Sequence, residues 1–214
     1  MNQSDVTIID YGVGNMLSVQ RGLERSDATV TVTSDPEVLL KSRRVILPGV
    51  GAFSNAMDAL QERGLIDAIQ DIVNNNIPFL GICLGMQLLL DESEEFGITK
   101  GLGLIPGRVI PIPNLTQLGE MQKIPHIGWN ALHPGNKTSW DSPIHKYTRP
   151  GEFVYFVHSF MAVPSSKDHL IADCDYGGHS IAATIGYKKV FGCQYHPEKS
   201  GRTGLNILRS FLYA

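Results

Sequence analysis

Residues 77–92 read IPFLGICLGMQLLLDE, and this stretch decides the fold. The short apolar run 77–80 is long enough for one buried strand. Residues 86–92 carry strong helix formers, with apolar positions at helical spacing. A strand that turns directly into a helix with a reactive residue at the corner is the nucleophile-elbow layout, here with cysteine in place of serine. The stretch therefore predicts an α/β fold with a candidate nucleophile, Cys83, at the end of a core strand.

Two features of the GICLG run at 81–85 favour a reactive thiol. The glycines Gly81 and Gly85 allow a tight turn, and we expect that a Cβ at either position would crowd the thiol. The following helix would direct unpaired N–H groups and a partial positive charge at the Cys83 sulfur, which favours the nucleophilic thiolate. The alternative from this run alone is a small buried cysteine that ends a core strand, since free cysteine is among the most buried residue types.

Composition and charge exclude several classes of protein. The 214 residues are 43% hydrophobic and 18% charged, and we expect a single domain over 1–214. A net charge of −3 without a basic tract argues against a nucleic-acid partner. No apolar run is long enough to span a bilayer, and the first residues lack the features of a signal peptide. Three cysteines fit a reducing cytosol better than secretion, so we expect a cytoplasmic protein with no membrane partner.

The first half of the chain alternates strand-like and helix-like segments. Strands are expected before Cys83 and at residues 6–10, 28–33 and 45–47. Helices are expected to begin at Asp35 and to cover 15–25 and 55–74, the last with a break at Gly64. Short apolar strands that do not alternate, separated by amphipathic helices, indicate a mostly parallel central sheet flanked by helices, in a flavodoxin-like layout.

The second half has a different character. Residues 101–163 are richer in proline and glycine, and the clearest strand there is 153–157. Two further strands are expected at 180–185 and 190–194, followed by a closing helix over 204–212. We expect this half to add a small antiparallel extension to the α/β domain, with the catalytic corner at the carboxyl ends of the parallel strands.

A base for the cysteine is expected in the run His196-Pro197-Glu198. This run follows an apolar strand, and proline favours an extended conformation at the residue before it. Residues two apart in an extended segment project to the same side, so Glu198 can accept from the His196 ring and stabilise its imidazolium form. The alternative is a surface histidine in a turn, which becomes weak beside a cysteine elbow at the end of another strand.

Acyl chemistry also needs donors for an oxyanion. The N–H of Leu84 directly follows the nucleophile, and a second donor could come from the PGVG turn at 48–51. Other sites fare worse. The run 12–17 lacks the third glycine of a dinucleotide fingerprint, and the histidines and cysteines show no metal-ligand spacing, so we expect no cofactor and no metal.

Together these motifs resemble the class I (triad) glutamine amidotransferases, through GICLGMQ at 81–87 and His-Pro-Glu at 196–198. Within that family, further blocks are similar to the glutaminase subunits of imidazole glycerol phosphate synthase, which act in histidine biosynthesis. These blocks are PGVGAF at 48–53, PHIGWN at 125–130, YFVHS at 155–159 and HPEKSG at 196–201. The resemblance runs from Asp10 to the last helix, essentially the full chain.

The resemblance implies a glutaminase mechanism. Cys83 would attack the side-chain amide of glutamine to give a γ-glutamyl thioester and ammonia, with His196 as acid and base and Glu198 orienting it. It further implies an oxyanion hole from the backbone N–H groups of Leu84 and Val50. The substrate-binding residues that it implies are Gly49, Gly51, Gln87, Glu95, Ser159 and Phe160.

The resemblance also implies a partner. In such enzymes ammonia passes to a (β/α)8-barrel cyclase subunit, with which the glutaminase forms a heterodimer. The cyclase makes imidazole glycerol phosphate and an aminoimidazole carboxamide ribotide. The positions that match the partner interface or ammonia passage are Asn15, Trp129, Asn130, Tyr155 and Lys199; a plain helix N-cap is the alternative for Asn15.

Other functions stay open from the sequence. A free-standing cysteine hydrolase on the same fold would turn over without a partner and would not prefer glutamine. A non-catalytic scaffold is disfavoured because thiol, base and acid are all present. A paralogous amidotransferase subunit could feed ammonia to a different barrel synthase, and its chemistry would be identical.

Overall fold

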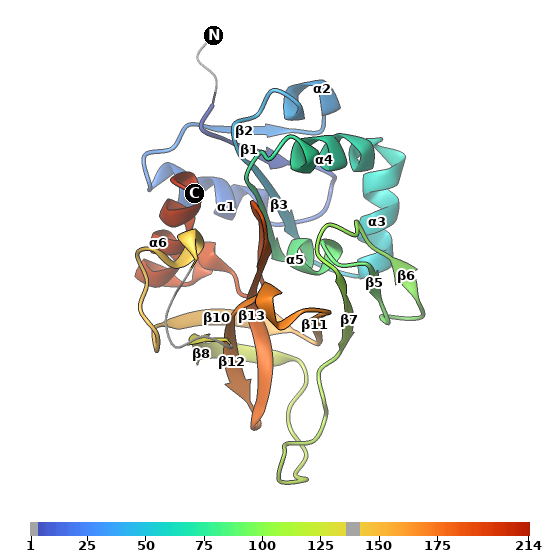
Figure 1. Cartoon of the computed structure of the whole chain (residues 1–214), viewed down its shortest axis with the longest axis vertical. Coiled ribbons are helices and arrows are strands. Elements are labelled where there is room, and N and C mark those ends of the chain that lie inside the picture. Colours follow the sequence, from blue (N-terminus) through green and yellow to red (C-terminus); the bar gives the residue numbers. More distant parts are fainter. Residues whose placement is uncertain (1–3, 136–141) are drawn as a thin grey trace.

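The computed structural model describes residues 4–135 and 142–214. At its centre lies an eight-stranded sheet (Figure 1). Across the sheet the strands are β2 (Val30–Thr33), β1 (Val6–Ile9), β3 (Val45–Gly49), β4 (Phe79–Cys83), β14 (Val190–Cys193), β13 (His179–Tyr187), β12 (Leu170–Tyr176) and β9 (His133–Pro134). The first five strands are parallel, and the last three extend the sheet in antiparallel pairs. The predicted mostly parallel sheet with an antiparallel extension is confirmed.

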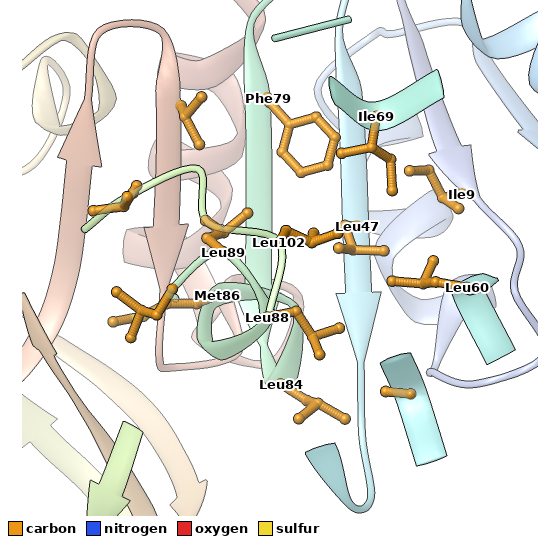
Figure 2. Packing of buried hydrophobic residues seen from close by; sticks show 14 of the residues in the cluster. Ile9, Leu47, Leu60, Ile69, Phe79, Leu84, Met86, Leu88, Leu89 and Leu102 are labelled. Carbon is orange, nitrogen blue, oxygen red and sulfur yellow. The ribbon is translucent and has the colours of Figure 1, made fainter. Parts of the chain in front are cut away.

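Helices cover both faces of the sheet because its strand residues alternate between two apolar clusters. Ile9 and Leu47 belong to one cluster, shown in Figure 2, and their neighbours Ile8 and Ile46 belong to the other. The first cluster is covered by α2 (Pro36–Leu39), α3 (Phe53–Glu62), α4 (Leu65–Asn74) and α5 (Leu84–Leu88). The second is covered by α1 (Met16–Glu24) and α6 (Gly201–Leu212).

The predicted break in the long helix is confirmed at Gly64. Its φ of +62° lies in the left-handed region, which glycine adopts without a steric penalty. This residue separates α3 from α4. No helix among the described residues has the length and apolar character needed to cross a membrane.

The helix predicted directly after Cys83 is confirmed, but it is shorter than the helix-forming residues 86–92 indicated. Helix α5 ends at Leu88, and Glu92 already belongs to β5 (Glu92–Ser93). Tertiary hydrogen bonds end the helix, because the N–H groups of Leu102 and Leu104 donate to the carbonyls of Leu88 and Leu89 at 2.9 and 2.8 Å. Those carbonyls therefore have partners without a further helical turn.

Two smaller sheets complete the second half. One is a ribbon of β8 (His126–Ala131) and β10 (Phe153–His158). The other holds β11 (Phe160–Pro164), β7 (Gly107–Pro111), β5 and β6 (Thr99–Lys100). Short 3₁₀ turns lie at η1 (Pro143–His145), η2 (Lys167–His169) and η3 (Pro197–Lys199). The ribbon and η3 lie beside the carboxyl ends of β4 and β14, where the candidate site is built.

Candidate active site

Cys83 lies where β4 turns into α5. Its backbone has φ +55° and ψ −111°, a conformation that is strained for a residue with a side chain. Such strain at the strand-to-helix corner is the mark of a nucleophile elbow, so the predicted layout is present. The side chain is nearly buried and reaches a cavity described below.

The prediction that Gly81 and Gly85 keep space free for the Cys83 thiol is wrong. A Cβ on Gly81 would collide with the carbonyl oxygen of Gly85, and a Cβ on Gly85 would collide with the carbonyl oxygen of Leu47. The glycines therefore let strand and helix approach each other closely, instead of leaving room around the thiol. The effect on the site is indirect, because this close approach sets how α5 packs against β3 and β4 behind the elbow.

His196 and Glu198 form a buried pair. The ring Nδ1 lies 2.8 Å from Glu198 Oε1, and the two side chains are only 3% and 1% exposed. The contact and the extended backbone of His196 were both predicted, but the extended segment does not continue to Glu198, which sits in the 3₁₀ turn η3 that begins at Pro197. Proline suits the first position of such a turn, since it needs no N–H partner there.

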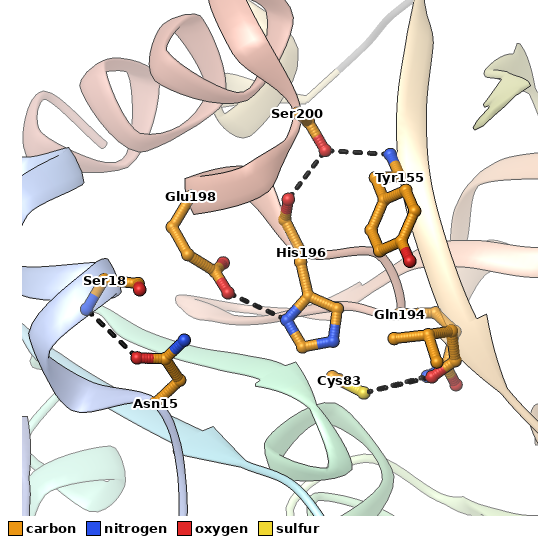
Figure 3. Close-up of polar contacts among 9 residues, drawn as sticks. Asn15, Ser18, Cys83, Tyr155, Gln194, His196, Glu198 and Ser200 are labelled. Atoms are coloured by element: carbon orange, nitrogen blue, oxygen red, sulfur yellow. Dashed lines mark hydrogen bonds and ion pairs between the residues drawn. The ribbon is translucent and has the colours of Figure 1, made fainter. Parts of the chain in front are cut away.

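Two opposing effects set the charge of His196. Burial disfavours the imidazolium, but the interactions with Cys83 and Glu198 outweigh it and raise the pKa of His196 from 6.5 to about 9. Because Nδ1 is directed at the carboxylate, the proton available for chemistry is on Nε2. Figure 3 shows the Nε2 edge of the ring facing the Cys83 sulfur, and no other partner for Nε2 exists among the described residues.

The main chain holds His196 rigidly against β10. Its N–H donates to the Tyr155 carbonyl at 3.0 Å. The Ser200 hydroxyl donates to the His196 carbonyl at 2.6 Å and accepts from the Tyr155 N–H at 2.9 Å (Figure 3). The general base is thus fixed to the ribbon that carries three of the predicted interface residues, Trp129, Asn130 and Tyr155.

A cavity of about 420 Å³ brings the predicted site together. Its lining includes Cys83 and His196, the two proposed oxyanion residues, and most of the predicted substrate-binding residues: Val50, Leu84, Gly51, Gln87, Glu95, Ser159 and Phe160. Gly49 does not line it; a Cβ there would lie 2.7 Å from the Tyr11 hydroxyl and 2.9 Å from the Gly85 nitrogen. Gly49 therefore allows close packing of β3 behind the elbow.

Two of these residues already have protein partners. Glu95 Oε2 accepts the N–H of Phe53 at 2.6 Å, so its carboxylate sits at the start of helix α3. Gln87 Nε2 donates to the Phe160 carbonyl at 3.1 Å and to Gln194 Oε1 at 3.0 Å. The Gln87 amide thus keeps only its oxygen free to meet a ligand.

Three lining residues were missed by the sequence reasoning: Phe96, Val157 and His158. Each is a direct or near neighbour of a predicted residue, which is the signal that could have found them. Burial lowers the pKa of His158 to about 4, so its ring is neutral at ordinary pH. Its Nδ1 donates to the Phe160 carbonyl at 2.8 Å and thereby fixes backbone at the cavity wall.

The residues predicted for an interface or passage lie in three places. Trp129 and Tyr155 are opposite each other on the β8–β10 ribbon, with ring centroids 6.0 Å apart, and Trp129 is 55% exposed. Lys199 is exposed in η3. Asn130 is tied locally, to the Asp175 carbonyl and the Ala131 N–H. Asn15 caps α1 by accepting the N–H of Ser18 at 3.3 Å, which is the alternative role considered for it.

Within residues 4–135 and 142–214, no group of three or more His, Cys, Asp or Glu side chains is placed to hold a metal ion. A strained cysteine, a charged histidine directed at it and a buried carboxylate behind the histidine form a unit for nucleophilic acyl transfer.

Comparison with known proteins decides the family. The model for "Glutamine amidotransferase class-I" matches residues 7–214. The chain belongs to the class I glutamine amidotransferases. It is 47% identical over 210 residues to "Imidazole glycerol phosphate synthase subunit HisH 1" of Legionella pneumophila strain Lens, covering 98% of this chain and 99% of the relative. It is likewise 47% identical over 207 residues to the HisH subunit of Geobacillus kaustophilus, covering 97% and 95%.

Solved structures agree on the fold of this amidotransferase. A crystal structure of a glutamine amidotransferase superposes with a TM-score of 0.72 at 16% identity, covering 97% of each chain. The structure of PurLQS from Thermotoga maritima gives a TM-score of 0.70 at 20% identity, again covering 97% of each chain. At such low identity these matches establish the class I amidotransferase fold and nothing finer.

Proposed function

We propose that this chain is the glutaminase subunit of imidazole glycerol phosphate synthase, hydrolysing glutamine to glutamate and ammonia in histidine biosynthesis. The observation that carries the proposal is the single cavity lined by Cys83, His196, Gln87 and Glu95. Identity of 47% along nearly the whole length of the HisH subunits supports the same assignment.

The first half of the reaction uses the sulfur as nucleophile. The Cys83 thiolate attacks the side-chain carbonyl carbon of glutamine and forms the C–S bond. The oxyanion accepts from the backbone N–H of Leu84, and in our proposal also from that of Val50. When the C–N bond breaks, His196 gives its Nε2 proton to the departing nitrogen, leaving ammonia and a γ-glutamyl thioester.

The second half returns the enzyme to its starting state. Neutral His196 takes a proton from water as the water oxygen attacks the thioester carbon. The C–S bond then breaks, which restores the Cys83 thiolate beside the His196 imidazolium. The product is released as glutamate after its new carboxyl group gives its proton to solvent. Glu198 Oε1 lies 2.8 Å from Nδ1 and stabilises the imidazolium there.

We propose that the α-amino and α-carboxylate groups of glutamine bind the lining residues other than Cys83, His196 and the oxyanion donors. The Glu95 carboxylate suits the substrate ammonium, and the Gln87 oxygen can accept from it or from the amide. Backbone groups around Ser159 and Phe160 line the same cavity and offer donors and acceptors. Gly51, with φ +98° and open space around it, gives the oxyanion turn the freedom to reorient.

We further propose a heterodimer with a (β/α)8-barrel cyclase subunit that receives the ammonia. Support comes from the exposed apolar side chains of the β8–β10 ribbon, Ile127, Trp129 and Phe153, each more than half exposed. Exposed aromatic groups of this kind favour a protein partner. A cytoplasmic location agrees with three free cysteines, Cys83, Cys174 and Cys193.

The test is glutamate release by the chain alone, with the cyclase, and with the cyclase and its substrate. We expect turnover to rise by orders of magnitude in the last mixture, because partner occupancy would favour the reactive oxyanion turn. Equal activity of the isolated chain would support a free-standing hydrolase instead. Failure to bind the histidine-pathway cyclase would support a paralogous amidotransferase subunit.

A further inference from the structure

Gln194 lies beside the nucleophile, at the end of β14 and two residues before His196. Its side chain is completely buried. Its amide Nε2 lies 3.8 Å from the Cys83 sulfur, a contact visible in Figure 3. The catalytic steps described above give this amide no part, although it contacts a reacting atom.

The Phe160 carbonyl decides which end of the Gln194 amide faces the sulfur. The Phe160 oxygen can only accept, so the Gln87 atom 3.1 Å from it is the amide nitrogen. The same nitrogen lies 3.0 Å from the Gln194 side chain, which must therefore present its oxygen there. The remaining end of the Gln194 amide, the NH₂ group, then faces the sulfur.

Neighbouring groups keep this arrangement fixed. The Phe160 carbonyl also accepts from His158 Nδ1 at 2.8 Å. His158 Nε2 must then be the acceptor for His126 Nδ1, which lies 3.0 Å away. Both histidine rings and both glutamine amides are buried, so reversing any one of these bonds would leave a buried polar group without a partner.

We propose that Gln194 is a further catalytic residue, which donates an N–H to the Cys83 sulfur, with Gln87 as the residue that orients it. A weak acceptor as a thiol, sulfur becomes a stronger one as a thiolate, because charge strengthens a hydrogen bond. The donor would stabilise the thiolate before it attacks and again when the C–S bond of the thioester breaks. It moves no proton and leaves the balance of each step unchanged.

This donor complements the other contacts of the sulfur. The Val157 carbonyl lies 4.0 Å from Sγ and can only accept, which favours the protonated thiol. Helix α5 spans five residues, so its terminus offers little of the dipole of a longer helix. The Gln194 amide supplies a side-chain donor where the short helix is a weak source of positive potential.

The proposal rests on Cys83 as the nucleophile of the proposed glutaminase, but its test does not need glutamine. The rate of alkylation of Cys83 by iodoacetamide reports the thiolate, and peptide mass spectrometry separates it from the buried Cys174 and Cys193. Gln194→Met keeps the length of the side chain and removes the donor. We expect alkylation at neutral pH to slow by about tenfold to a hundredfold, the effect of one hydrogen bond to a charged group.

The pH dependence separates a lost donor from a displaced cysteine. In Gln194→Met the deficit in alkylation rate should shrink at alkaline pH, because the thiol no longer needs the donor to ionise there. The titratable groups around Cys83 are unchanged in this variant: His196 with its partner Glu198, His158, Glu95 and Tyr11. A displaced sulfur would react slowly at every pH. A Met variant that reacts like the wild type at neutral pH, or that is equally slow at all pH values, overturns the proposal.

Two further variants complete the design. Gln194→Glu, nearly identical in shape, replaces the donor with an anionic acceptor and should slow alkylation more than Gln194→Met; it also serves if the Met variant fails to fold. Gln122→Met is the matched control, since that amide donates to the Pro113 carbonyl and does not line the cavity. If the wild type fails to hydrolyse glutamine while these alkylation effects appear, the proposed function falls and the role of Gln194 stands.

Discussion

Glu198→Gln tests how strongly the buried carboxylate stabilises the imidazolium form of His196. The rise of the His196 pKa from 6.5 to about 9 corresponds to about 3 kcal/mol of preference for the imidazolium. Cys83 and Glu198 both oppose the effect of burial, and loss of the Glu198 charge should remove on the order of 1 kcal/mol of this preference. This predicts a fall in kcat of about tenfold, since a weaker imidazolium means less thiolate.

The tautomer of His196 need not change in this variant. Glu198 Oε2 is buried without a hydrogen-bond partner among the described residues, so the substituted amide is free to turn its oxygen toward Nδ1. The orienting hydrogen bond is then kept and only the charge is lost. We therefore expect a smaller effect than in Glu198→Ala, which loses both the bond and the charge.

The assay is steady-state glutamate release in the presence of the cyclase, together with unfolding free energies across pH. A raised histidine pKa stabilises the folded state fully below pH 6.5, and this contribution is lost as the pH rises through about 9. The stability difference between wild type and Glu198→Gln should therefore be largest below pH 6.5 and fade above 9. Glu24→Gln, at an exposed helix position, is the matched control.

An unchanged kcat in Glu198→Gln, or a change confined to a higher KM for glutamine, would refute the role of Glu198 in stabilising the imidazolium. A stability difference that stays constant from acid to alkaline pH would refute the electrostatic part separately.

Three other changes have defined outcomes. Gly85→Ala should lower the free energy of unfolding by several kcal/mol, and the melting temperature with it, because the new Cβ collides with the Leu47 carbonyl. A variant as stable as the wild type would contradict this close approach of helix and strand. Burial lowers the pKa of His145 to about 3 and of His158 to about 4. The free energy of unfolding should therefore fall as the pH drops below 6.5, by about 1.4 kcal/mol per pH unit for each group. A free energy of unfolding that stays constant down to pH 5 in denaturant titrations would contradict this. Trp129→Ala should weaken cyclase binding at least about tenfold by calorimetry, and an unchanged Kd would remove this ribbon from the interface.

Much of the fold could be predicted because local signals agree with the tertiary structure. The apolar run before Cys83, the break at Gly64 and the strand before His196 are each written in a short stretch of sequence. The bounds of α5 could not be predicted, because the helix ends at hydrogen bonds from residues 102–104, which are distant in the sequence. Helix propensity alone would favour a helix that continues through the leucines at 88–90.

The candidate site could also be predicted only in part. Motifs identify Cys83, His196 and Glu198, but not that Glu198 reaches the ring from a 3₁₀ turn. Gln194 went unnoticed because its function depends on Gln87, more than a hundred positions away, and on a carbonyl in a third segment. Contacts that depend on three distant segments have no local signature, so only the folded chain reveals them.

The most direct measurement of the central claim is glutamate release by Cys83→Ala in the complex with the cyclase and its substrate. We expect this variant to form no glutamate above background, while the cyclase in the same complex still turns over with added ammonia. Glutamine hydrolysis by Cys83→Ala at the wild-type rate would contradict the assignment of Cys83 as the nucleophile.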